Sequence, residues 1–207
     1  MKNTSRPEVK RLPLKQLAES VFMGVNFGRL PRPTDGGTTP VIHVKDVDEG
    51  VLMPLEDLEL ISLPDDAQYE RQRLKFGDIL VSARGTLMKC ATIPHSYRGA
   101  VASANFIVVR MGNRPAVEAE LVCAFLRHPA VKAKVLSRVT STAQPALTIR
   151  ELENLIIPLP SKEIRADLTQ LLIIAEEQYR TAVECARLRK EEAMDILAKY
   201  MDPFYEA

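Results

Sequence analysis

The fold is decided by the stretch from Leu155 to Tyr200, which reads LIIPLPSKEIRADLTQLLIIAEEQYRTAVECARLRKEEAMDILAKY. Pro158 and Pro160 cannot lie inside a helix or a central strand, so the first residues are expected to form an extended hinge. Ser161 offers an N-cap after it. Because neither Pro nor Gly occurs from Ser161 to Asp202, the stretch predicts one helix of roughly 40 residues, about 60 Å long at 1.5 Å per residue.

Ten residues of this helix repeat at alternating spacings of four and three, which is the a/d pattern of a coiled coil. These positions, called the heptad seam below, are Leu168, Leu172, Ala175, Tyr179, Ala182, Ala186, Arg189, Ala193, Ile196 and Tyr200. Alanine in the middle lets two helices approach closely. A helix this long with such a seam predicts pairing, and hence a homodimer. The alternative is a solvated terminal helix lying on its own domain.

Length and composition allow one domain of about 150 residues with an appendage. The start, Met1 to Arg11, is basic and polar, and no apolar run of 18 residues exists, so neither a signal peptide nor a membrane span is expected. Cys90, Cys123 and Cys185 are widely spaced and indicate free thiols in a reducing cytoplasm. No pair of Cys or His ligands has metal-site spacing, so no metal or other cofactor is expected.

Charge is distributed unevenly along the chain, although the net charge is only +1. Residues 46–70 carry nine acidic residues and no Lys or Arg. Residues 161–207 carry seven bases against ten acids, and the remainder carries 21 bases against 8 acids. A basic body with acidic segments set apart is typical of a protein that binds a polyanion such as nucleic acid. The alternative is a charged surface that only confers solubility.

The body is expected to be rich in strands, with the α+β class for the chain as a whole. A loop covers residues 24–40, and residues 12–22 form a short helix or an entry strand. Expected strands cover 41–44, 79–83, 87–93 and 106–109, the second and third as a hairpin. Expected helices cover 118–127, 131–138 and 149–155, the last opened by a capping box of Thr148 and Glu151. The domains are therefore 1–158, the strand-rich body, and 159–207, the long helix and tail.

Four of these segments, in this order, resemble the specificity (S) subunits of type I restriction-modification systems. A Gly-Thr-Thr-Pro loop leads into a strand at Gly37–Val44, and Lys75–Gly85 contains Gly-Asp, a hydrophobic strand and Arg-Gly. A polar loop and a capped helix then lead to the Ile-Pro-Leu-Pro junction at Ile157–Pro160, and the heptad helix follows. The resemblance covers about residues 12–200. It implies a strand-rich target recognition domain followed by a long coiled-coil helix.

Two departures from the family bear on assembly. The family has two recognition domains and two helices, whereas this chain has one of each, which implies a half-subunit that dimerises. The family junction often continues with Glu-Gln, but here Ser161, Lys162 and Glu163 follow. The resemblance implies a sequence-specific double-stranded DNA recognition subunit for phage defence. It would read a bipartite site and direct a methyltransferase (M) subunit, possibly with a restriction subunit.

The motifs of the partner enzymes are missing from the sequence. There is no Asn/Asp-Pro-Pro-aromatic site with a glycine-rich cofactor loop, no Walker loop, and the one Glu-x-Lys, Glu8–Lys10, has no upstream acid. The chain is therefore not expected to be an enzyme. The other reading is a protein-interaction adaptor, whose helix recruits a partner while the body binds no DNA.

Candidate DNA-binding residues carry basic, amide or hydroxyl side chains. Arg84 and Asn105 are expected at base edges, because Arg pairs with guanine and Asn with adenine. The alternative for Arg84 is a structural ion pair at the hairpin. The complete set is Arg32, Thr38, Lys45, Arg84, Lys89, Arg98, Asn105, Lys134 and Gln144.

Overall fold

The computed structural model describes residues 9–29, 37–64, 67–112, 116–139 and 145–201. The chain divides into two compact units, residues 1–165 and 166–207, and each is described by itself. The expected α+β class, with a strand-rich body and a long C-terminal helix, is confirmed. Within the described ranges no helix is both long and apolar enough to cross a membrane.

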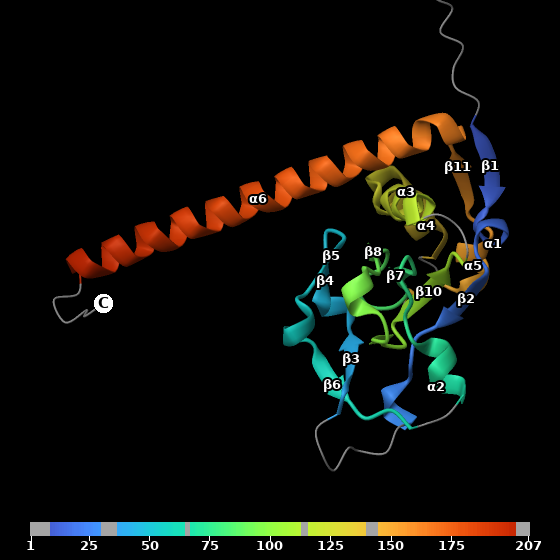
Figure 1. The fold of residues 1–207 in the computed structure, drawn as a ribbon, viewed down its shortest axis with the longest axis horizontal. Helices are drawn as coiled ribbons and strands as arrows, with labels where there is room; N and C mark the ends of the chain where they lie inside the picture. Colours follow the sequence, from blue (N-terminus) through green and yellow to red (C-terminus); the bar gives the residue numbers. More distant parts are fainter. Residues whose placement is uncertain (1–8, 30–36, 65–66, 113–115, 140–144, 202–207) are drawn as a thin grey trace, which may run out of the picture. The chain divides into compact units, whose positions relative to one another are not determined.

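A four-stranded antiparallel sheet forms the centre of the first unit, in the order β2-β10-β7-β8. Its strands are β2 (Ser20–Met23), β10 (Phe106–Arg110), β7 (Ile79–Ser82) and β8 (Cys90–Thr92). The apolar run of β10 confirms the predicted buried strand, and β7 with β8 confirms the predicted hairpin. Figure 1 shows β2, β10 and β7 side by side, although β2 lies far from the other two in sequence.

Both faces of this sheet are buried, because successive side chains of a strand point to opposite sides. Ile79 and Ile107 belong to a core that also contains residues of α1 (Leu14–Leu17), α3 (Ala116–Arg127) and α5 (Ile149–Glu153). Leu80, Phe106 and Val108 belong to a second core on the other face. A strand buried on both faces reads as a continuous apolar run, which is why β10 could be predicted.

The second core is shared with a smaller layer of strands and short 3-10 helices. A three-stranded sheet has the order β6-β3-β9, where β3 (Thr39–Ile42) pairs antiparallel with β6 (Glu59–Ile61) and parallel with β9 (Val101–Ala102). A two-residue ladder joins β4 (Val47–Asp48) to β5 (Val51–Leu52). The connecting elements are η1 (Phe27–Arg29), η2 (Val44–Asp46), η3 (Leu55–Asp57), η4 (His95–Tyr97) and α2 (Ala67–Gln72).

The three expected helices of the first unit are present, although α3 and α4 each begin two residues earlier than expected. Pro129 separates α3 from α4 (Pro129–Val139) and is the first residue of α4, where its missing N–H costs nothing. The Thr148 hydroxyl accepts the Glu151 backbone N–H at 3.2 Å, and the Thr148 backbone N–H donates to the Glu151 carboxylate at 2.8 Å. The capping box predicted for α5 is thereby confirmed.

The prediction of an extended hinge at residues 155–160 was wrong in one respect, because residues 156–159 form a strand that is paired. β11 (Ile156–Leu159) pairs antiparallel with β1 (Lys10–Pro13), with Lys10 opposite Leu159 and Pro13 opposite Ile156. Pro158 is tolerated because this sheet has two strands, so each strand keeps an edge that needs no N–H donor. Figure 1 shows β1 and β11 side by side.

The second unit continues the helix α6 (Lys162–Met201), which confirms the predicted long helix. Nine of the ten heptad-seam side chains are exposed, and Leu172 is half-buried. Ion pairs within the helix join Arg187 to Glu184 at 2.6 Å and to Glu191 at 2.5 Å. At about 100° per residue these three residues lie on the side of α6 opposite the seam.

The three cysteines differ sharply in accessibility. Cys90 on β8 and Cys123 on α3 are buried, whereas Cys185 on α6 is exposed, and all three are free thiols. Burial raises the pKa of Cys90 to about 12, against smaller opposing effects of Lys132 and Arg127. Burial likewise raises the pKa of Cys123.

We therefore expect a thiol reagent at neutral pH to modify Cys185 alone in the folded protein, because alkylation needs an accessible thiolate. All three thiols should react after unfolding in denaturant. Mass spectrometry of the intact protein measures this directly, and Cys185→Ser should abolish the native modification. Labelling of Cys90 or Cys123 at a similar rate to Cys185 would contradict the described burial.

Candidate nucleic-acid interface

Loops that are distant in sequence meet at one end of the central sheet. The Ala83 N–H donates to the Asn105 carbonyl at 2.7 Å, and the Ser103 N–H donates to the Ile42 carbonyl at 3.0 Å. The rings of Phe27 and His43 lie edge to face, 5.8 Å apart. We call this the strand-end surface and define it as residues 26–28, 43–45, 84–86 and 104–105.

Both predicted base-reading residues, Arg84 and Asn105, lie on this surface. Ser82 lies opposite Phe106 in the ladder between β7 and β10. Arg84 comes two residues after Ser82, and Asn105 comes directly before Phe106. Both residues therefore lie at the same end of the sheet. Both side chains are exposed. Among the described residues Arg84 has no ion-pair partner, so the structural ion pair considered for it is absent there.

The loop that carries Arg84 is fixed by its own hydrogen bonds. The Ser82 hydroxyl donates to the Thr86 carbonyl at 2.5 Å and accepts the Lys89 backbone N–H at 2.8 Å. Gly85 has a φ of +72°, which a residue without a side chain adopts easily. A loop held this way presents Arg84 from a defined backbone position, as base reading requires.

The other predicted residues are dispersed. Lys45 is exposed on the strand-end surface, while Thr38 is exposed at the opposite end of β3. Lys134 is exposed on α4, and Arg98 borders a depression with Arg73 and Lys75. Arg32 and Gln144 lie outside the described residues.

The Lys89 side chain makes contacts within the fold that reduce its availability to a ligand. Its ammonium donates to the Val47 carbonyl at 2.7 Å and lies 4.0 Å from the Asp48 carboxylate. The contact ties the hairpin of β7 and β8 to the ladder of β4 and β5. A phosphate role for Lys89 would compete with these contacts, so Lys89 is a less accessible cation than Arg84 or Lys45.

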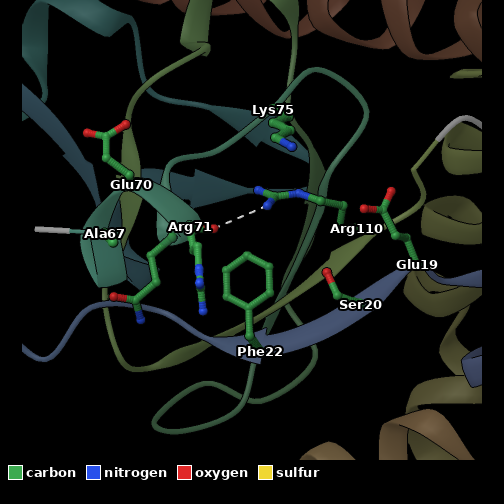
Figure 2. Close-up of a pocket in the computed structure, with 9 residues that line it drawn as sticks. Glu19, Ser20, Phe22, Ala67, Glu70, Arg71, Lys75 and Arg110 are labelled. Carbon is green, nitrogen blue, oxygen red and sulfur yellow. Dashed lines mark hydrogen bonds between the residues drawn. The ribbon is translucent and has the colours of Figure 1, made fainter.

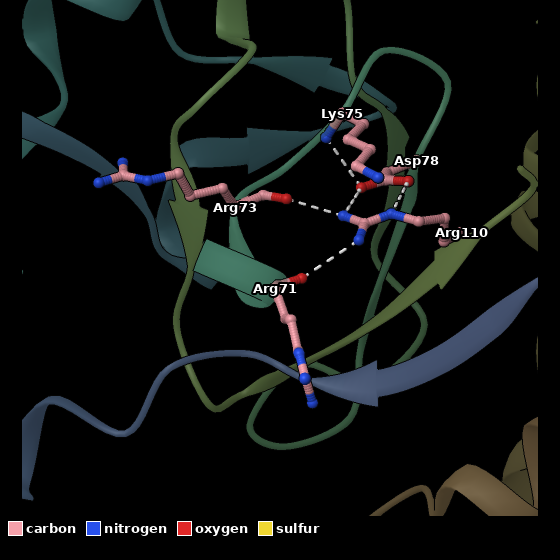
Figure 3. A network of polar contacts seen from close by, with 5 residues as sticks. All are labelled: Arg71, Arg73, Lys75, Asp78 and Arg110. Carbon is pink, nitrogen blue, oxygen red and sulfur yellow. Dashed lines mark hydrogen bonds and ion pairs between the residues drawn. The ribbon is translucent and has the colours of Figure 1, made fainter. Parts of the chain in front are cut away.

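A buried ion pair that sequence reasoning missed lies at the other end of the central sheet. The Arg110 guanidinium donates to the Asp78 carboxylate through two nitrogens, at 2.7 and 3.1 Å, and the side chains are 8 and 2% exposed. It also donates to the backbone carbonyls of Arg71 and Arg73, as Figure 3 shows. Asp78 accepts a third hydrogen bond from the Lys75 backbone N–H.

Arg110 therefore joins β10 to the start of β7 and to the C-terminal end of α2. Its guanidinium also lies over the Phe22 ring, 5.0 Å from the centroid. Two sequence signals could have found this pair, namely the arginine that ends the apolar run of β10 and the aspartate that precedes the run of β7. The Gly-Asp motif at residues 77–78 is thus a structural element of the sheet.

A cavity of about 900 Å³ adjoins this ion pair. Figure 2 shows Arg110 beside Phe22, with Lys75 above it, Arg71 to its left and Glu19 to its right. The lining residues, which include two exposed cations and two exposed carboxylates, are Glu19, Ser20, Phe22, Ala67, Glu70, Arg71, Gln72, Lys75 and Arg110. Within the described part of the chain, no three His, Cys, Asp or Glu residues are grouped to hold a metal ion.

The order of the elements is a strand-rich domain followed by a long helix. Residues 8–176 match the family described as the type I restriction modification DNA specificity domain. The match covers most of the chain, and the protein belongs to this family. No curated protein matches the chain.

Solved structures with the same fold come from type I restriction-modification systems. One, described in work on complex assembly and conformational transition of the type I R-M system, has a TM-score of 0.63, is 17% identical, and covers 95% of this chain. The HsdS subunit from Thermoanaerobacter tengcongensis has a TM-score of 0.59, 16% identity and 100% coverage. The S subunit from M. genitalium has a TM-score of 0.56, 12% identity and 99% coverage.

This chain spans about half the length of those proteins, namely 45, 53 and 49% respectively. At such low identity the likeness establishes the fold.

Proposed function

We propose that this chain is a sequence-specific double-stranded DNA recognition subunit that performs no chemistry itself. It acts in the cytoplasm and directs a methyltransferase subunit, and possibly a restriction subunit, to their target. The observation that carries the proposal is the strand-end surface, where Arg84 and Asn105 lie close together on loops anchored to the sheet. Family membership supports the same function.

The side chains on this surface suit reading of the major groove. A guanidinium can donate two hydrogen bonds to guanine, and a carboxamide can donate to and accept from adenine. Exposed cations such as Lys45 and Lys134 would bind phosphates, which positions the protein without reading sequence. The proposal thus assigns sequence preference to Arg84 and Asn105, and general affinity to exposed lysines such as Lys45 and Lys134.

The proposal includes self-association through the heptad seam. Two copies would present two recognition domains, one toward each end of a helix pair, and so read two half-sites separated by an unspecified spacer. Because the copies are identical, twofold symmetry makes the half-sites an inverted repeat. Their centres are expected near one turn of DNA apart, roughly 34 Å, so that both domains reach the same face.

We expect Arg84→Ala to relax sequence preference at one base position and to cost about 1 to 3 kcal/mol on the preferred site. Lys134→Ala should weaken all duplexes alike and reduce the slope of log affinity against log salt by about one. Selection from random duplexes followed by binding titrations at several salt concentrations measures both effects.

Arg11→Ala is the matched control, since Arg11 is an exposed arginine on β1, away from the strand-end surface. It should leave the sequence preference unchanged. If Arg84→Ala behaved like Arg11→Ala, Arg84 would not read a base. If the unmodified protein failed to shift random duplex DNA at low salt, the adaptor function would replace DNA recognition.

A further inference from the structure

An exposed aromatic pair lies at the end of the central sheet opposite the strand-end surface. The rings of Phe76 and His95 are stacked nearly parallel, with their centroids 4.3 Å apart and an angle of 16° between their planes. Both residues are exposed, and Phe76 is the one aromatic residue among the large apolar side chains exposed in the described part of the first unit. Because each ring covers one face of the other and Phe76 is still 48% exposed, ring surface is left over for a further planar group.

Two segments, residues 74–78 and 93–100, hold this aromatic pair in place. Phe76 lies in the turn before β7, and His95 is the first residue of η4. Backbone hydrogen bonds join the two segments, from the Gly77 N–H to the Ile93 carbonyl at 2.9 Å, from the Gly99 N–H to the Leu74 carbonyl at 3.0 Å, and from the Leu74 N–H to the Ala100 carbonyl at 2.8 Å. Both rings are therefore presented from fixed backbone positions, as a binding site requires.

Two cations border the aromatic pair without a counterion. Lys75 and Arg98 are exposed and line, together with the two rings, a depression of about 400 Å³. Neither side chain forms an ion pair or a hydrogen bond with another described residue. The third cation of the depression, Arg73, is ion-paired with Glu70 at 2.6 Å. The depression therefore combines stacked rings with two positive charges that the rest of the described chain leaves unneutralised.

We propose that this depression binds single-stranded nucleic acid, with an unpaired base stacked on Phe76 and His95 and the flanking phosphates held by Lys75 and Arg98. Rings beside cations bind single strands because every base has a face that stacks and every nucleotide carries a phosphate. A duplex does not suit these rings, since its bases cover one another's faces. Only an unpaired or extruded base offers a free face.

The site is separate from the strand-end surface. Lys75 comes before β7 and Arg84 comes after it, so the four residues of this strand, about 13 Å at 3.3 Å per residue, lie between them. The two surfaces can therefore hold different nucleic-acid strands at the same time. The inference goes beyond the proposed recognition of duplex DNA and does not depend on it.

Binding of the full-length protein to labelled oligothymidylate of about ten nucleotides, followed by fluorescence anisotropy at low salt, tests the site. An abasic oligomer of the same length carries the same phosphates without bases, which separates stacking from charge. Phe76→Ala should weaken binding of oligothymidylate on the order of tenfold and leave binding of the abasic oligomer unchanged. Phe76→Tyr keeps a ring and should bind like the parent. Tighter binding of oligouridylate than of oligothymidylate would identify the single strand as RNA.

The two cations give a second, independent measurement. Lys75→Ala should weaken binding of both oligomers alike and reduce the slope of log affinity against log salt by about 0.7, the value for one phosphate of a single strand. Arg11→Ala is again the matched control, because Arg11 is exposed on β1 and lies outside the depression. It should change neither the affinity nor the slope. A saturating amount of the preferred duplex should not displace oligothymidylate from the unmodified protein.

Several results would overturn the inference, and they leave duplex recognition standing. The first is an unmodified protein that does not bind oligothymidylate at low salt. The second is a folded Phe76→Ala variant, checked by circular dichroism, that binds oligothymidylate as tightly as the parent or loses affinity for both oligomers equally. Displacement by the preferred duplex would place the single strand on the strand-end surface instead. Binding of oligothymidylate that depends on Phe76, without any binding of duplex DNA, would reject the proposed function alone.

Discussion

Asp78→Ala is expected to lower the free energy of unfolding of the recognition domain by about 3 to 5 kcal/mol, because it leaves the Arg110 cation buried without its counterion. The substitution also removes the acceptor of the Lys75 backbone N–H. A loss of this size is a large fraction of a typical domain's stability, so much of the variant should be unfolded at 37 °C. Urea unfolding followed by circular dichroism measures the change.

Two further variants distinguish the effect of an unpaired buried charge from the effect of removing a side chain. Asp78→Ala combined with Arg110→Met should be more stable than Asp78→Ala alone, since no buried charge is left unpaired. Arg187→Ala removes an arginine that is ion-paired but exposed, and should leave the unfolding transition unchanged. An Asp78→Ala protein as stable as the parent would mean that the buried pair does not hold β7 and β10 together.

Ala182→Glu combined with Ala186→Glu is expected to separate the chains. These positions lie in the middle of the heptad seam, so in a helix pair formed through the seam four carboxylates would be enclosed between the two helices. Charges in such a site have neither water nor a counterion. Light scattering should report a monomer, and affinity for a duplex with two half-sites should fall by about 10² to 10⁴, the contribution of linked binding.

The matched control places the same charges on the outer face of the helix. Thr181→Glu combined with Leu188→Glu changes two exposed residues seven apart, at positions outside the heptad seam. This variant should remain a dimer and bind the two half-sites normally. Binding of a single half-site should be the same for all three proteins. If both double variants behaved alike, added charge would be responsible and the seam would not be the interface.

The parts of the fold that sequence could predict are those encoded locally. The apolar run of β10, the hairpin of β7 and β8, the capping box at Thr148 and the Pro-free and Gly-free length of α6 each depend on neighbouring residues. Pairings between distant segments were not predicted. Neither the β1–β11 ladder nor the parallel contact of β3 with β9 leaves a local pattern, because each depends on tertiary packing.

The same division holds for the candidate interface. Arg84 and Asn105 are predicted from their chemistry and from their places beside predicted strands, and the register of β7 and β10 explains their proximity. Lys89 is predicted from its charge alone, and charge does not reveal that its ammonium donates to the Val47 carbonyl. Arg110 was not predicted as a buried residue, because a cation at the end of an apolar run is typical of a strand end exposed to solvent. Only the structure shows that its partner is Asp78.

The ladder of β1 and β11 has a consequence for how proteins of this kind can be assembled. The two strands run antiparallel with Lys10 opposite Leu159, so the chain enters and leaves the recognition domain at one place. A domain whose ends lie together can be inserted or exchanged as a cassette without disturbing its core. One copy of such a cassette with its helix spans about half of the related subunits. Tandem duplication of one gene segment could therefore build a two-domain subunit without rearranging either fold, and swapping cassettes would change the sequence read while preserving the helix.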